Sequence, residues 1–136
     1  MSKARPASSA SARRDERGSV SIELLIVLPA LFAVMFLGVQ AALIHHAKSV
    51  AIAAVQEGAR AAGGEEGTAS DGVRAANGFL AKAGGSDVIT RTRTTARRAT
   101  TNVTVTVQGR SLSVIPGWRP RVVQSASRPV ERLTAP

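Results

Sequence analysis

The sequence of 136 residues contains no cysteine and no tyrosine. Without cysteine the chain cannot form a disulfide, a thiolate nucleophile, or a Cys-ligated zinc or iron–sulfur site. Aromatic residues are scarce, and two of the four, Phe32 and Phe36, lie in one apolar run. Acidic residues are also few, because 18 Lys and Arg against 9 Asp and Glu leave a net charge of +9. The length excludes a multidomain enzyme, and the charge suits phosphates, anionic lipid or an acidic partner.

Sequence signatures of catalysis are missing as well. The two histidines, His45 and His46, are adjacent and would point to different sides of a helix, which is poor geometry for one metal ion. No Gly-rich phosphate loop, zinc-ligand spacing or nucleophile elbow can be read from the chain. We therefore predict that the protein is not an enzyme and that it uses no cofactor and no metal.

An uncharged run of 21 residues, Leu24 to Ile44, predicts a transmembrane helix. At about 1.5 Å per helical residue it reaches roughly 31 Å, close to the ~30 Å hydrocarbon core of a bilayer. A buried helix of a soluble domain is the alternative, but it needs more surrounding protein than this chain can supply. The preceding segment, 1–18, is polar and basic, so we expect it to be disordered and cytoplasmic, with the C-terminal part outside.

A secretory signal peptide is a competing interpretation of the same run. Val39, Gln40 and Ala41 supply small or tolerated residues where a signal peptidase would cut. However, the apolar part before this site, residues 24–39, slightly exceeds the usual ~7–15 residues of such a segment, and the leader is long. On this alternative the mature protein would be soluble and secreted.

A glutamate, Glu23, lies in the first turn of the apolar helix, where a carboxylate is costly unless a cation meets it. Basic residues, Gly18, four residues and then this glutamate resemble the processing site of type IV pilin-like proteins. The resemblance implies that a prepilin-type peptidase cuts between Gly18 and Ser19. It also implies that Glu23 pairs with the N-terminal amine of a neighbouring subunit, which would neutralise two buried charges.

The segment Gly18-Ser-Val-Ser-Ile-Glu-Leu-Leu-Ile-Val-Leu-Pro29 resembles, more narrowly, the opening of TadE-like proteins. These are pseudopilins of tight-adherence (Flp-type) pilus systems. Glu57-Gly-Ala-Arg-Ala-Ala62 is similar to the small-residue segment of that family, and the tail is similar to actinobacterial members. The resemblance implies assembly of a Flp-type pilus or a related secretion machine. The implied partners are other pilin-like subunits, inner-membrane pilus assembly proteins and membrane lipid.

The helical pattern continues beyond the membrane, with small residues at i, i+3, i+4, i+7 spacing along one face. Such a stripe suits close approach by a partner helix or by the protein's own domain, and the sequence favours neither. We predict that this packing face includes Ala51, Ala54, Gly58 and Ala62, with Pro29 in the membrane part. Gly63 and Gly64 are expected to end the helix.

The remaining chain predicts a short helix beginning at 68–71 and β-strands after Asp87. Alternating β-branched residues indicate strands at 88–94 and 101–107. Gln108-Gly109 is the expected turn into a strand at 111–115, and another strand is expected at 121–126. The predicted fold class is therefore α+β: a long N-terminal transmembrane helix that extends outward, and a small antiparallel β-meander domain. The expected segments are a removable leader (1–18), the helix (19–62) and an extracytoplasmic domain (63–136).

Four arginines in and shortly after the first predicted strand form a basic set, Arg91, Arg93, Arg97 and Arg98. Clustered cations can contact phosphates, so a cationic protein that binds DNA or anionic cell-wall polymer is the second functional hypothesis. Single-strand binders interleave aromatic residues with such cations, and none occurs here. Charges that protect a strand edge from pairing also explain the set, and we favour this explanation, so nucleic acid is a partner we do not favour.

Overall fold

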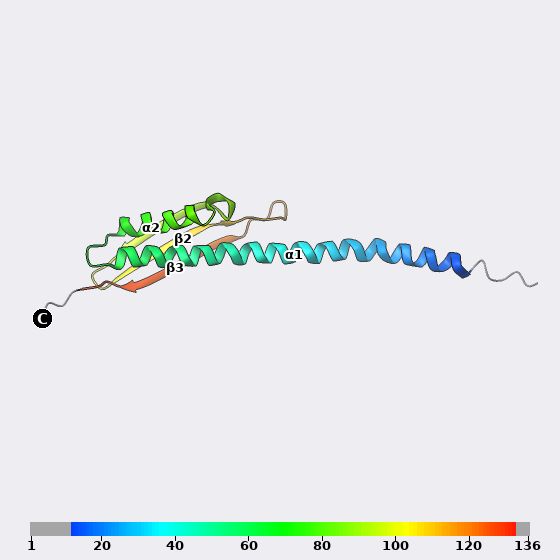
Figure 1. The fold of residues 1–136 in the computed structure, drawn as a ribbon, viewed down its shortest axis with the longest axis horizontal. Coiled ribbons are helices and arrows are strands. Elements are labelled where there is room, and N and C mark those ends of the chain that lie inside the picture. The colour runs from blue at the N-terminus through cyan, green and yellow to red at the C-terminus, as the bar shows by residue number, and fades with distance from the viewer. Residues whose placement is uncertain (1–11, 133–136) are drawn as a thin grey trace, which may run out of the picture. The chain divides into compact units, whose positions relative to one another are not determined.

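The computed structural model describes the backbone of residues 12–132 and the side chains of residues 21–132 (Figure 1). The elements are α1 (Ala12–Gly63), α2 (Ala69–Lys82), a 3-10 turn (Gly85–Asp87), β1 (Ile89–Arg98), β2 (Asn102–Ser111) and β3 (Arg121–Pro129). The chain divides into two compact units, Met1–Gly38 and Val39–Pro136, and α1 contributes residues to both. The long apolar helix and the small antiparallel sheet confirm the predicted α+β class.

The first unit is helical and apolar. Side chains from Ser21 to Val39 are all exposed, and no residue of the most apolar window is buried. An unburied helix of this hydropathy is long enough to cross a membrane, whereas the core helix of a soluble protein would be covered. This observation disfavours the buried-helix alternative.

The helix begins at Ala12, inside the segment for which the sequence predicts a disordered leader. Residues 12–18 are mostly Ala, Arg and Glu, which are good helix formers. They also extend a helix that already exists, so they avoid the cost of nucleation. The earlier leader residues, 1–11, lie outside the described part of the chain.

The sheet of the second unit has the order β1-β2-β3 and is antiparallel throughout, as expected for a meander. The predicted turn at Gln108-Gly109 and the predicted strand at 111–115 are wrong, because β2 continues to Ser111 and an irregular loop follows. Gly109 serves a close approach within the sheet, since a Cβ there would lie 2.6 Å from Cγ1 of Ile89. This explains why a glycine interrupts the β-branched pattern without making a turn.

Both helices cover one face of this sheet (Figure 1). Val103, Val105 and Val107 of β2 are fully buried on that face, while the alternate threonines are partly exposed. The predicted packing residues of α1 lie in the same core: Ala51, Ala54, Gly58 and Ala62 are buried. Of the two alternatives for the small-residue stripe, the structure therefore favours packing on the protein's own domain.

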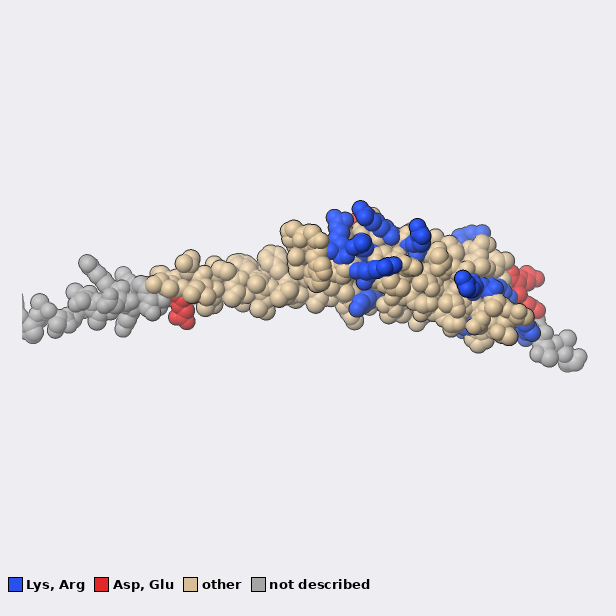
Figure 2. Space-filling model, turned by 180° about the vertical axis from the view of Figure 1, so that it is seen from behind, with Lys and Arg blue, Asp and Glu red and all other residues tan. Residues whose placement is uncertain are grey.

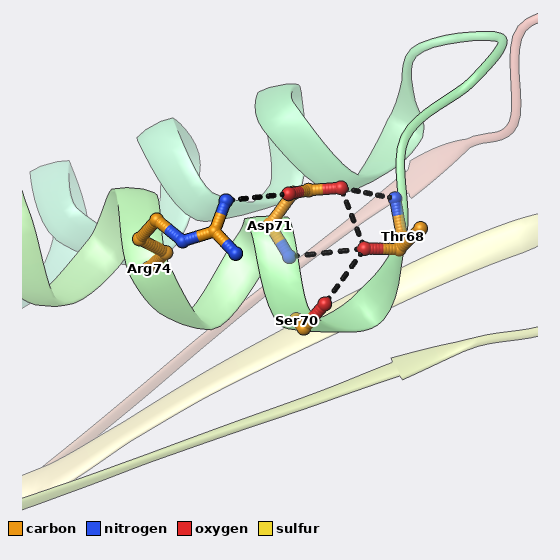
Figure 3. Close-up of polar contacts among 4 residues, drawn as sticks. All are labelled: Thr68, Ser70, Asp71 and Arg74. Atoms are coloured by element: carbon orange, nitrogen blue, oxygen red, sulfur yellow. Dashed lines mark hydrogen bonds and ion pairs between the residues drawn. The ribbon is translucent and has the colours of Figure 1, made fainter.

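The start of α2 carries a capping box (Figure 3). The Thr68 hydroxyl accepts from the Asp71 backbone N–H at 3.2 Å, and the Asp71 carboxylate accepts from the Thr68 backbone N–H at 3.0 Å. Arg74 donates to the same carboxylate at 2.9 Å. Hydrogen bonds from Thr68, with a smaller contribution from the Arg74 charge, lower the pKa of Asp71 below its ordinary value. The box satisfies two of the free donors of the first turn.

This lowered pKa predicts a pH effect on stability. As the pH falls, the unfolded chain takes up a proton at the ordinary pKa near 3.8 before the folded chain does, so folding becomes less favourable. The stabilisation that the Asp71 carboxylate contributes is complete above the ordinary pKa. It is lost as the pH falls through the lower pKa of this group in the folded chain. The midpoint of thermal unfolding, measured from about pH 6 to pH 2, should therefore depend less on pH in Asp71→Asn than in the wild type. Equal slopes would contradict the assignment.

Candidate functional site

The residues of the expected processing site lie in α1. Gly18 and Ser19 have helical backbone, and their side chains lie outside the described set. Glu23 is exposed, and among the side chains of residues 21–132 none places a cation within 4 Å of its carboxylate. Pro29 is also exposed, within the same helix. The carboxylate of Glu23 thus stands near the N-terminal end of a bare apolar surface, accessible to a partner.

A second polar side chain of the apolar run is buried. Gln40 is 1% exposed, although its neighbours Val39 and Ala41 are exposed. Its Oε1 accepts from Ser113 Oγ at 2.8 Å and from the Val114 backbone N–H at 2.9 Å, and its Nε2 donates to the Leu112 carbonyl at 3.3 Å. These three bonds hold the loop between β2 and β3 against the helix. The loop and α1 are therefore fixed together where the second unit begins.

The loop that Gln40 holds, residues 112–120, exposes apolar side chains. Val114 is 39% exposed and Trp118, the sole tryptophan of the chain, is 47% exposed. The loop is compact rather than extended, since Ser113 Oγ accepts from the Ile115 backbone N–H at 3.1 Å and the Trp118 backbone N–H donates to the Ile115 carbonyl at 3.3 Å. A compact turn thus exposes a tryptophan on the loop that Gln40 holds against α1.

The four arginines of β1 do not act as one group. Arg98 is partly buried and donates to the carbonyls of Ala62, Gly64 and Glu65, which lie at and beyond the C-terminal end of α1. A cation at this position satisfies carbonyl oxygens that lack helical partners. Arg98 is therefore a structural cap, and the sequence-based grouping of Arg98 as an anion contact is not supported by this geometry. Arg97 is exposed at the same end of the sheet.

Arg91 and Arg93 instead join arginines from other strands. Together with Arg110 of β2 and Arg121 of β3 they line one hollow of about 350 Å³, and we refer to these four residues as the arginine cluster. The register explains the grouping, because Arg93 pairs with Gln108 and Arg110 pairs with Arg121. Figure 2 shows a group of Lys and Arg side chains on this domain with no Asp or Glu among them. Among the described residues, no carboxylate lies within 4 Å of the cluster.

The comparison with protein families is informative for the N-terminal part of the chain. Residues 18–60 match the family model of TadE-like protein. The match begins at Gly18 and ends at Arg60, so it covers the first segment on which the resemblance rests and residues 57–60 of the second. No curated protein and no solved structure is significantly similar to the chain.

The matched residues, less than half of the chain, are thus similar to a family of pilus structural components. Together with the exposed apolar helix, this similarity fits a membrane-anchored surface protein. The similarity of the tail to actinobacterial members lies outside the matched residues and stays a prediction. Among residues 21–132 there is no group of His, Asp and Glu side chains that could hold a metal ion.

Sequence reasoning missed two features of this region. The bonding of Gln40 was not expected, although a lone amide in an otherwise apolar run is a signal for a buried polar contact. The arginine cluster was missed because its members are distant in sequence and come together only through strand register. Arg110 and Arg121 flank the loop, so a correct β2 boundary would have paired them.

Proposed function

We propose that the protein is a TadE-like minor pilin or pseudopilin that is processed after Gly18 and that serves in assembly of a Flp/Tad-type pilus or related secretion machine. The observation that carries the proposal is the match at residues 18–60, which starts at the glycine that precedes the expected cleavage site. Its N-terminus would be cytoplasmic and its α+β domain extracytoplasmic. Its partners would be a prepilin-type peptidase, other pilin-like subunits and inner-membrane assembly proteins.

The exposed carboxylate of Glu23 supports a role in assembly. A carboxylate flanked by Ile22 and Leu24 on a bare apolar helix is unfavourable in lipid without a counter-charge. Cleavage after Gly18 would create an amine at Ser19, and the amine of a neighbouring subunit would supply that counter-charge. The carboxylate and the amine would then be buried together as an ion pair rather than singly.

The bonds of Gln40 argue against a secretory signal peptide. A signal peptidase cutting after Ala41 would remove Gln40 and leave the Val114 N–H and the Leu112 carbonyl without these partners. It would also cut within α1, which continues as a core helix to Gly63. Cleavage after Gly18 leaves the described packing of residues 39–132 intact, so it is the more compatible processing step.

The N-terminus of the membrane-extracted protein tests the proposal. In cells with a prepilin-type peptidase, mass spectrometry should find a mature chain that begins at Ser19, and a Gly18→Val variant should keep its leader because the added side chain obstructs backbone approach in the peptidase. A start at Met1 or at Ala42 in the wild type would overturn it.

The role of Glu23 is tested separately by co-purification of pilin-like subunits. Glu23→Ala should still be cleaved but should recover far less of its partners, since an unpaired amine would remain in the assembled helices. Glu57→Ala is the matched control, because that carboxylate lies on the same helix in an exposed pair with Arg60. Equal recovery with both variants would contradict charge pairing by Glu23.

A further inference from the structure

We infer that the arginine cluster binds the headgroups of anionic phospholipids and, with Trp118, holds the domain against the membrane surface. This inference rests on the membrane anchorage in the proposed function, but it needs neither cleavage nor pilus assembly. It concerns Arg91, Arg93, Arg110 and Arg121, which line one hollow at one end of the sheet.

The position of the cluster in the second unit is the first reason. The loop 112–120 joins β2 to β3, so Arg110 and Arg121 stand at its two ends. The Arg110 guanidinium donates to the Arg119 carbonyl at 3.1 Å, which ties the loop to the cluster. Gln40 ties the same loop to α1, immediately after the exposed apolar residues that end at Val39. The cluster is therefore at the end of the domain where the chain would leave the lipid.

The exposed apolar residues of the loop are the second reason. Trp118 and Val114 are exposed on the loop between Arg110 and Arg121 of the cluster. Tryptophan is favoured at the boundary between headgroups and acyl chains. A nucleic acid would need the cations but would gain nothing from an exposed valine. The combination of a tryptophan, a valine and four cations matches a surface that is both anionic and apolar, as a phospholipid interface is.

The conformation of Arg91 is the third reason. Its φ is +51°, in the left-handed region that L-residues other than glycine rarely adopt, and the β1–β2 register shifts between Thr90 and Arg93. Bulges of this kind re-aim a side chain at the edge of a sheet. Here the side chain of Arg91 joins the hollow. Among the residues that the structure describes, neither the Arg91 nor the Arg93 guanidinium makes a hydrogen bond or ion pair, so both groups are available to a phosphate.

Trp118, the sole tryptophan, reports on this contact directly. The full chain would be reconstituted in phosphatidylcholine vesicles with or without about 30 per cent phosphatidylglycerol, and Trp118 emission measured with lipids brominated near the headgroup. We expect stronger quenching in the anionic vesicles and its reversal by about 0.5 M salt. In the double variant Arg91→Gln/Arg93→Gln, the ratio of membrane-docked to undocked domain should fall about fivefold for each arginine replaced.

The matched control is Arg97→Gln/Arg128→Gln, which removes the same charge at the opposite end of the sheet and should leave the quenching unchanged. A second variant, Arg110→Gln/Arg121→Gln, should repeat the loss, with far-UV circular dichroism to verify folding.

Equal quenching in neutral and anionic vesicles, or an equal loss in the control, would overturn the inference. So would a cluster that binds labelled duplex DNA while anionic lipid leaves Trp118 unchanged. If alkaline extraction instead releases the chain from the vesicles, the membrane anchor of the proposed function is refuted, and the inference with it.

Discussion

Replacing Gly58 by alanine is expected to destabilise the domain by roughly 2 kcal/mol, since forcing extra atoms into a packed core typically costs 1–3 kcal/mol. A Cβ at Gly58 would lie 2.7 Å from the Gly72 carbonyl oxygen and 3.1 Å from Cβ of Ala76. A backbone oxygen of a neighbouring helix cannot rotate away, so α1 and α2 would have to separate. For a domain of this size the midpoint of thermal unfolding should fall by about 8–16 °C.

The chain offers a matched control for this prediction. Gly78 lies within α2, and a Cβ added there meets nothing within 4 Å. Gly78→Ala should therefore stabilise the domain by about 0.5–1 kcal/mol, through helix propensity alone. Circular dichroism of the full chain in detergent would compare the two variants. Effects of the same sign would refute the close crossing of the helices at Gly58 and Gly72.

The second large effect is expected for Gln40→Leu, which keeps the side-chain size but removes three hydrogen bonds. The Val114 N–H and the Leu112 carbonyl would lose partners that are partly buried, and each such loss costs about 1–3 kcal/mol. We expect a total of roughly 2–4 kcal/mol and release of the loop. Trp118 emission should then change, because the loop that carries it would no longer be fixed to α1.

Gln56→Leu is the control for Gln40→Leu, because Gln56 lies on the same helix and is exposed. This variant should change stability by less than about 0.5 kcal/mol. A Gln40→Leu protein with wild-type stability and unchanged Trp118 emission would show that the loop is held without the amide.

The core that these variants probe consists mainly of alanine and valine. Small residues bring the two helices close to each other and to the sheet, so stability depends on close contact rather than on large side chains. Helical spacing alone places Ala51, Ala54, Gly58 and Ala62 on one face of the helix, and all four are buried. The sequence left open whether a partner helix or the domain itself would cover the face.

Strand boundaries were predicted less well, for a local reason. A glycine after a β-branched run usually indicates a turn, and the sequence therefore predicts one at Gln108-Gly109. At Gly109 the requirement is instead space for Ile89 of the neighbouring strand. That contact joins residues 20 positions apart and has no local signature.

By itself, the sequence determined the apolar helix, the acidic residue near its start, the TadE-like segment and the α+β class, because each depends on composition or on short-range spacing. The tertiary structure alone decided that Gln40 holds the loop, that Arg98 caps α1, and that Arg91 and Arg93 group with Arg110 and Arg121. These arrangements depend on strand register and on contacts between distant segments. Local periodicity carries no information about either.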